Sequence, residues 1–319
     1  MDGGLRNGDP AVVVIGGGTG LATLLRGLKA YTARLTAVVT VADDGGSSGR
    51  LRREMDILPP GDIRNCLTAL AEDESLMSRL FQYRFEEGPL SGHSFGNLFL
   101  AALTKVTGDF EEAIRLSSNI LAIRGTVLPA SLEKVSLTAE LDDGRRVAGQ
   151  SSIVNSRQSC RRIWLEPQAA RATRAAVEAI AGADIVVIGP GSLFTSIIPN
   201  LLIGEIAEAV SNAACRRIYV CNVMTQPGET LEFSAADHLD ALEQHTRKGI
   251  VDTIVVNDVA PPPAVVKLYL RQGAAPVLID QERLQHAGVA VVAADVCSAG
   301  DFFHHDSERL AAVVMSLLH

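Results

Sequence analysis

The sequence predicts an α/β fold, a Rossmann-like, doubly wound and mostly parallel sheet with a helical insertion. Short all-apolar runs, typical of strands buried on both faces, alternate with segments of helical periodicity. Four of the loops that follow such runs are rich in Gly, Asn, Asp, Ser or Thr, as expected where parallel strands deliver loops to a ligand crevice. We therefore expect one domain over residues 1–319.

The N-terminal part predicts a β-α-β unit. Residues 11–15 are all apolar and predict a buried strand, and the glycine-rich turn 16–20 follows. Leucines then recur at helical spacing, which predicts a helix over 19–30, and a second buried strand is expected over 35–41. Such units build right-handed parallel sheets.

The middle of the chain predicts the insertion. Residues 43–62 are rich in Gly, Asp, Ser and Pro and predict a long loop with one helical turn. Helical signals dominate about 62–124, with N-caps expected at Asp62, Asp73, Ser94 and Asp109. A small β-hairpin subregion is expected over about 132–166, with strands at 135–141, 146–149 and 160–165.

Regular alternation resumes in the last half of the chain. The pattern predicts helices over 168–181, 201–213, 235–247 and 307–318, and strands over 184–188, 217–221, 253–256, 276–279 and 289–292.

Composition excludes some classes of function. The formal net charge of −8 argues against nucleic acid as a partner, because phosphate backbones need a basic surface. No apolar run approaches the roughly 20 residues that span a bilayer, and residues 1–10 do not resemble a signal peptide. The five cysteines show no C-x-x-C spacing and are expected to be reduced thiols. We expect a cytoplasmic protein without membrane insertion.

The first glycine loop is the strongest candidate for a phosphate site. Glycines let backbone N–H groups approach phosphate oxygens, and the next helix adds its positive N-terminal end. The dinucleotide fingerprint G-x-G-x-x-G/A fails at Leu21, and the G-K-[ST] pattern is absent. The loop contributes Gly16, Gly17, Gly18, Thr19 and Gly20.

Two adjacent carboxylates, Asp43 and Asp44, follow the second expected strand. An acid at this position can bond a ribose hydroxyl, and a pair can instead hold Mg²⁺ together with ligand phosphates. The residue types favour neither interpretation. Ser47 and Ser48 continue the same loop.

Two further loops, in the second half of the sheet, also follow buried strands and carry residues suited to binding a ligand. Gly189, Pro190, Gly191 and Ser192 form a second turn between a strand and a helix. Asn222 emerges from a buried strand, and its amide offers both donors and an acceptor. His93 and Asn97 lie four residues apart on one expected helical face, where His93 is either a cap or part of the site.

Seven motifs together resemble the YvcK/CofD-like family, specifically its YvcK branch. They run in order over nearly the whole chain: GGGTG at 16–20, ADDGGSSGR at 42–50, LPPGDIR at 58–64, GHSFGNL at 92–98, RGTVLPAS at 124–131, IGPGSLFTS at 188–196 and CNVMTQPGET at 221–230. Near the C-terminus the family often has Arg-His-Asp, where this chain has His304-His305-Asp306.

The resemblance implies a CofD-like fold and a protein that binds UDP-sugars of the UDP-N-acetylglucosamine type. It implies a regulatory role in cell shape, cell-wall precursor supply and growth on gluconeogenic carbon sources, with no required cofactor. Homodimerisation and partners among cell-wall synthesis proteins or Ser/Thr kinases are further implications. The sister CofD branch implies the alternative, an Mg²⁺-dependent transferase that moves a phospholactyl-type group from a guanosine diphosphate donor to a deazaflavin. An NAD(P)-dependent oxidoreductase is a weaker third hypothesis, because the fingerprint is broken.

The candidate residues follow from the loops and the resemblance together. Tyr269 lies where an aromatic ring can stack on uracil, although a helix-surface tyrosine is an equal interpretation. Asp43 and Asp44 are the candidate metal ligands, and we expect no catalytic residue. The expected nucleotide- and phosphate-binding residues are Gly16, Gly17, Gly18, Thr19, Gly20, Asp43, Asp44, Ser47, Ser48, Asn97, Gly189, Pro190, Gly191, Ser192, Asn222, Thr225, Gln226, Asn257 and Tyr269.

Overall fold

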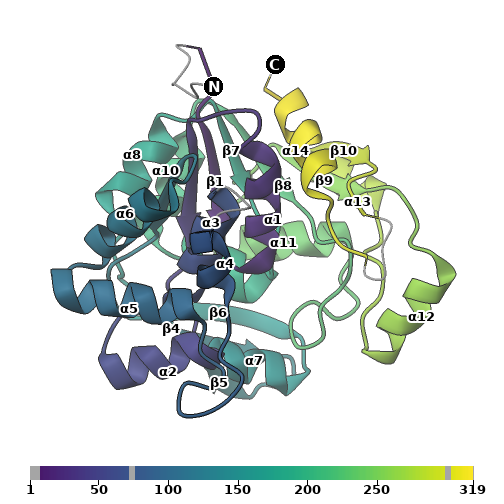
Figure 1. The fold of residues 1–319 in the computed structure, drawn as a ribbon. Helices are drawn as coiled ribbons and strands as arrows, with labels where there is room; N and C mark the ends of the chain where they lie inside the picture. The colour runs from purple at the N-terminus through teal and green to yellow at the C-terminus, as the bar shows by residue number, and fades with distance from the viewer. Residues whose placement is uncertain (1–7, 72–75, 299–302, 319) are drawn as a thin grey trace.

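A seven-stranded parallel sheet forms the centre of the molecule in the computed structural model, which describes residues 8–71, 76–298 and 303–318 (Figure 1). All of its strand pairs are parallel, which confirms the predicted α/β class. The strands are β1 (Val12–Gly16), β2 (Leu35–Val39), β3 (Thr126–Pro129), β7 (Ile185–Ile188), β8 (Arg216–Val220), β9 (Thr253–Asn257) and β10 (Ala290–Ala294).

The strand order β10-β9-β8-β7-β1-β2-β3 shows that the sheet is doubly wound. From β1 the chain runs outward through β2 to β3, and it then returns to β7 on the other side of β1. The order therefore reverses between β1 and β7, and ligands in such sheets bind beyond the carboxyl ends of the strands at this reversal.

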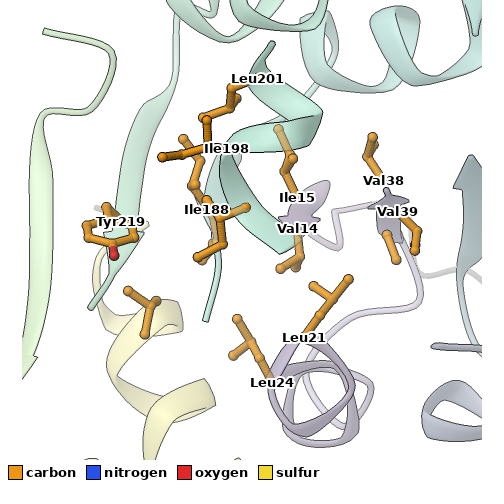
Figure 2. Close-up of a cluster of buried hydrophobic side chains, with 14 of the residues drawn as sticks. Val14, Ile15, Leu21, Leu24, Val38, Val39, Ile188, Ile198, Leu201 and Tyr219 are labelled. Carbon is orange, nitrogen blue, oxygen red and sulfur yellow. The ribbon is translucent and has the colours of Figure 1, made fainter. Parts of the chain in front are cut away.

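Apolar side chains cover both faces of the sheet because neighbouring strand residues point to opposite faces. Figure 2 shows Val14 facing Leu21 and Leu24 of helix α1 (Gly18–Leu28). Ile15 points the other way, towards Ile198 and Leu201 of α9 (Ile198–Leu201). All of these side chains are buried, so α1 and α9 are fixed against the end of β1.

The helical insertion predicted at about 62–124 is present as α3 (Gly61–Leu70), α4 (Leu76–Gln82), α5 (Phe95–Thr107) and α6 (Phe110–Leu121). Ser94 and Asp109 are N-caps as predicted, and each side chain accepts a backbone N–H. The prediction for Asp62 was wrong because Pro60 is the N-cap and Asp62 lies inside α3. Asp73 lies outside the described residues.

The predicted loop at 43–62 was wrong in part. Residues 46–55 form α2 (Gly46–Met55), a helix of ten residues rather than one turn. Ser47, Ser48, Gly49 and Leu51 are buried in it, so tertiary packing overrides the poor helix propensity of its glycines and serines.

The hairpin subregion is confirmed as a three-stranded antiparallel sheet, ordered β5-β4-β6, on the side of the molecule opposite the termini (Figure 1). Its strands are β4 (Ser136–Leu141), β5 (Arg146–Ala148) and β6 (Cys160–Glu166). Helix α7 (Gln150–Ser156), which the sequence analysis missed, connects β5 to β6. Gly228 packs directly on α7, because a β-carbon there would lie 2.4 Å from the Val154 carbonyl oxygen.

The last half of the chain departs from prediction in four places. The helix expected over 201–213 begins only at Gly204, and the short helices η1 (Leu193–Ile197) and α9, which were not predicted, precede it. The strand expected at 276–279 is wrong, because this stretch makes only an isolated bridge from Pro276 to Met224. The helix expected from 168 begins at 174, after the N-cap Thr173. The chain also forms two helices that were not predicted, α12 (Pro263–Arg271) and α13 (Gln281–His286). The remaining elements are α8 (Arg174–Ala181), the π-helix η1 (Leu193–Ile197), α10 (Gly204–Asn212), α11 (Ala235–His245) and α14 (Ser307–Ser316).

No single helix in the described ranges is long and apolar enough to cross a membrane, although a pair bent by 78°, Leu193–Leu201 with Gly204–Asn212, meets the length and composition test.

Candidate functional site

The two predicted glycine loops meet at the reversal of strand order. A β-carbon built on Gly20 would lie 2.7 Å from the Pro190 carbonyl oxygen, and one on Gly191 would lie 3.3 Å from the Gly17 carbonyl oxygen. Only glycine at position 20 permits this approach. The Asn200 amide donates to the Gly16 carbonyl at 3.1 Å and to the Ser196 carbonyl at 2.8 Å, which ties the first loop to the start of α9.

The first loop presents a helix N-terminus to the crevice. Helix α1 begins at Gly18, whose φ of 68° suits glycine, and the exposed Thr19 follows. Backbone N–H groups at such a terminus attract anions. The arrangement agrees with the predicted phosphate cradle, while ligand binding itself stays a prediction.

A buried carboxylate, Asp62, already occupies part of this cradle. A β-carbon on Gly17 would lie 2.6 Å from Asp62 Oδ2, and the Gly18 N–H donates to the same carboxyl group. Burial and then the charge of Asp43 raise the Asp62 pKa to about 7. The acid, directly beside the loop, therefore titrates close to neutral pH.

Asp43 faces the same crevice from the end of β2. Its Oδ1 accepts the Gly45 N–H at 2.8 Å, and its Oδ2 would lie 2.9 Å from a β-carbon on Gly61. Burial raises the Asp43 pKa, and hydrogen bonds from Gly45 and Ser48 partly oppose that effect. Asp43 and Asp62 therefore form a pair of interacting acids at the glycine loop.

The Asp44 carboxylate makes its contacts away from the glycine loop, at the N-terminus of α7. Its Oδ1 accepts the Ser151 N–H at 3.0 Å, and its Oδ2 would lie 2.0 Å from a β-carbon on Gly149. The carboxylate therefore caps the N-terminus of α7 and joins the main sheet to the three-stranded sheet. The described residues contain no group of three or more His, Cys, Asp or Glu side chains arranged to hold a metal ion.

Ser47, His93 and Asn97 form a buried cluster between α2 and α5. Ser47 Oγ lies 2.9 Å from His93 Nδ1 and accepts from the Asn97 amide at 3.1 Å. Burial is the main reason that the His93 pKa is lowered. The expectation that His93 and Asn97 share one helical face was wrong in part, because Ser94 is the N-cap and His93 lies outside α5, although both side chains contact the hydroxyl of Ser47.

The second glycine loop connects to the segment after β8 through side chains. The Gln226 amide donates to Ser192 Oγ at 3.1 Å, and the Asn222 amide donates to Gln226 Oε1 at 3.2 Å. Glu229 lies behind this series of side-chain hydrogen bonds. Its carboxylate accepts hydrogen bonds from the Phe194 N–H at 3.0 Å and from the Thr195 hydroxyl at 2.8 Å. Burial raises the Glu229 pKa to about 7.

Two neighbouring hollows lie beyond the ends of β8 and β9. One, of about 410 Å³, is lined by Gln226, Tyr269, Gln272 and His305, and the other, of about 380 Å³, by Asn257 and mostly apolar side chains. Asn222, Val223 and Phe303 line both. The second glycine loop is thus connected to two open hollows through the side chains of Gln226 and Asn222.

Thr225 and Tyr269 have structural contacts in this region. The Thr225 hydroxyl accepts the Ala275 N–H at 2.9 Å, and the Tyr269 hydroxyl donates to the Phe303 carbonyl at 3.2 Å. These bonds hold the 222–230 loop and α12 around the first hollow.

Sequence reasoning missed the roles of Asp62, Glu229 and Asn200. Asp62 was assigned a capping role, although its place in the run Pro59-Pro60-Gly61-Asp62 after an acidic loop was the available signal. Glu229 and Asn200 belong to loop and helix segments whose burial becomes apparent only when the two halves of the sheet pair.

Comparison with known proteins agrees with this geometry. A family model described as 2-phospho-L-lactate transferase CofD matches residues 12–297. The gluconeogenesis factor of Bacillus subtilis is 48% identical over 311 residues, which are 97% of this chain and 98% of that protein. The gluconeogenesis factor of Halalkalibacterium halodurans is 48% identical over 306 residues, 95% of each chain.

A solved structure is also similar. The crystal structure of a Bacillus halodurans protein has a TM-score of 0.94 and 47% identity, covering 97% of this chain and all of that one. The doubly wound sheet, the paired glycine loops and these matches together show that the chain belongs to the CofD family, on the branch of the proteins named gluconeogenesis factors.

Proposed function

We propose that the protein is a cytoplasmic regulator that binds a UDP-sugar of the UDP-N-acetylglucosamine type. In this proposal it links cell-wall precursor supply and cell shape to growth on gluconeogenic carbon sources. The observation that carries the proposal is the contact between the two glycine loops at the reversal of strand order, where Gly20 lies against Pro190.

The contacts around the two glycine loops support one direction for the proposed ligand. In this proposal the diphosphate lies across the N-terminus of α1, where backbone N–H groups are available to anions. A series of hydrogen-bonded side chains connects the neighbouring second glycine loop to the two hollows; it consists of Ser192, Gln226 and Asn222. The hollows are large enough for a nucleoside. The sugar then points towards Asp43 and the end of β2.

Calorimetric titration with UDP-N-acetylglucosamine, UDP-glucose, GDP and NAD tests the proposal, with and without Mg²⁺. We expect micromolar, uridine-selective binding that Thr19→Val and Asn222→Ala both weaken about 5- to 50-fold, as the loss of one or two hydrogen bonds predicts. Lys248→Ala, an exposed change in the turn before β9, is the control and leaves the affinity unchanged. Absence of uridine-nucleotide binding contradicts the proposal, and sustained turnover of the UDP-sugar contradicts a purely regulatory role.

A transferase of the CofD type is the second candidate, and the adjacent acids Asp43 and Asp62 are the observation that favours it. Carboxylate oxygens suit Mg²⁺, which would neutralise the charge beside a bound diphosphate. This candidate predicts GDP binding with a strict Mg²⁺ requirement and transfer of a phospholactyl-type group to a deazaflavin. With both substrates and the metal supplied, a complete lack of product excludes it.

A further inference from the structure

A third hollow lies where the three-stranded sheet meets the ends of α9 and α11. Its volume is about 480 Å³, which is within the range of sites for small ligands. Residues 162–166 of β6 line one side of it, and Leu202, Gln244 and His245 line another. Its lining shares no residue with the two glycine loops or with the hollows beyond β8 and β9. It is therefore a separate place on the protein.

His245 ties the two sides of the hollow together. Its Nδ1 lies 2.7 Å from the Ala241 carbonyl oxygen, so Nδ1 carries the proton, because a carbonyl oxygen can only accept. Its Nε2 is then the acceptor for the Ile163 N–H of β6, at 3.0 Å. The hollow is therefore held in shape by the fold itself.

The edge of β6 does not suit the addition of a peptide strand. Such a strand pairs with free backbone groups at alternate residues of the edge. The Ile163 N–H already binds His245, and Pro167, which follows the strand, has no N–H to offer. Leu165 alone is left between them. The hollow therefore fits a small molecule better than an extended peptide.

Two arginine side chains reach the hollow from one face of the three-stranded sheet. Arg146 and Arg162 are the cross-strand neighbours of Glu140 in β5 and β6, and both of them are exposed. Within the described part of the chain, neither guanidinium makes an ion pair, and Glu140 pairs with Arg161 instead, at 3.7 Å. Both positive charges are thus accessible to a ligand.

Trp164 positions one of these arginines. The Arg146 guanidinium carbon lies 5.5 Å from the centre of the indole ring, a cation–π contact that leaves the charge in place. Glu166, the second acid in the lining, accepts the indole N–H at 3.2 Å. Counting Arg161, three arginines meet two acids around the hollow, which is a positive surplus in a chain with a formal net charge of −8.

We propose that this hollow binds the phosphate monoester of a small polyhydroxy compound, such as a sugar phosphate. The planar guanidinium groups of Arg146 and Arg162 match phosphate oxygens in pairs, and together they balance the two charges of a monoester. Gln168 and Gln244, whose amides both donate and accept, line the same hollow and suit hydroxyl groups. The site is separate from the proposed nucleotide crevice, so the inference does not depend on the proposed function.

The chain contains a single tryptophan, so fluorescence reports on this hollow directly. A phosphate that draws Arg146 away from the indole ring should change the emission of Trp164. Titration with glucose 6-phosphate should give a saturable change, half complete between about 10 μM and 1 mM. Glucose, which has the same ring without the charge, should give none. Calorimetry should report the same affinity as fluorescence.

Two variants assign the affinity to the arginines. By calorimetry, Arg146→Gln and Arg162→Gln should each weaken the binding of glucose 6-phosphate about 10- to 100-fold, as the loss of charge-assisted hydrogen bonds predicts. Both side chains are exposed, so the fold should persist, and urea unfolding checks this. Arg247→Gln changes an exposed arginine outside the hollow, and as the matched control it should leave the affinity unchanged.

Three results would overturn the proposal. One is the absence of a saturable response to glucose 6-phosphate up to about 10 mM. Another is an unchanged affinity in both arginine variants. The third is competition by UDP, which would place the phosphate in the nucleotide crevice. That result would leave the proposed function standing while removing this site.

Discussion

Gly20 and Pro190 bring the two halves of the sheet into contact, and a β-carbon on Gly20 would lie only 2.7 Å from the Pro190 carbonyl oxygen. Such a distance is well inside normal van der Waals contact, so a larger residue must push the glycine loops apart. We predict that Gly20→Ala costs about 1–3 kcal/mol of unfolding free energy and weakens nucleotide binding. Urea unfolding and calorimetric titration measure the two effects.

Gly204→Ala is the matched control, because a β-carbon there meets nothing within 4 Å. Position 204 begins α10, where alanine is a better helix former than glycine. We expect unchanged binding and equal or slightly greater stability. Equal behaviour of the two variants would show that the loop contact does not matter.

The buried acid at the glycine loop predicts pH-dependent binding. With a pKa of about 7, Asp62 is mostly protonated at pH 6 and mostly charged at pH 8, beside the expected phosphate. In the absence of Mg²⁺ the affinity for UDP should therefore fall about 3- to 30-fold as pH rises from 6 to 8. The Asp62→Asn variant should show a flatter dependence, whereas an identical slope in both proteins would refute the assignment.

Glu229 predicts a pH dependence of stability. Its folded pKa of about 7 lies above the ordinary value of 4.5, so the folded state binds more protons than the unfolded chain between these values. Its contribution to stability is present below pH 4.5 and is lost as pH rises through 7. Wild-type protein should therefore lose stability relative to Glu229→Gln between pH 5 and pH 8, by about 1–3 kcal/mol.

Urea unfolding of both proteins at pH 5, 6.5 and 8 measures this change. Comparison with the variant removes the contribution of Asp62, whose pKa is raised in the same direction. A stability difference that stays constant across this range would contradict the shifted pKa of Glu229.

Substitutions of Asp43 and Asp44 should have different effects on the Mg²⁺ dependence of nucleotide binding. Asp44 caps α7, so Asp44→Ala should cost about 1 kcal/mol of stability without changing any Mg²⁺ dependence of binding. Asp43→Ala should reduce that dependence, because Asp43 faces the crevice with Asp62. Titrations at several Mg²⁺ concentrations check both variants, and the reverse pattern would restore Asp44 as the metal ligand.

The strands and the loops at their ends were largely predictable from sequence. Runs such as 12–16 and 185–188 are apolar because helices cover both faces of the parallel sheet, and this leaves a continuous signal. The glycine loops were identifiable for a related reason, since close backbone approach at Gly20 permits no side chain.

Other features depended on contacts between distant segments. Position 49 of α2 requires glycine because a β-carbon there would lie 1.8 Å from the Asp44 carbonyl oxygen, so this glycine reflects a close contact inside a helix and not a loop. The four-residue strand β3 is stabilised by its pairing with β2 rather than by its own pattern. Likewise, nothing near Asp44 in the sequence indicates that its partner is Ser151, which is 107 residues away.

The pairing of β1 with β7 also determines when the crevice can exist during synthesis. The Ala11 N–H donates to the Asp184 carboxylate across a sequence separation of 173 residues, so the first glycine loop is made long before its neighbour. Contacts between residues so far apart in the sequence close large loops, and they form slowly during folding. A chain emerging from the ribosome therefore cannot bring the two glycine loops of the proposed nucleotide site together until more than half of it has been translated.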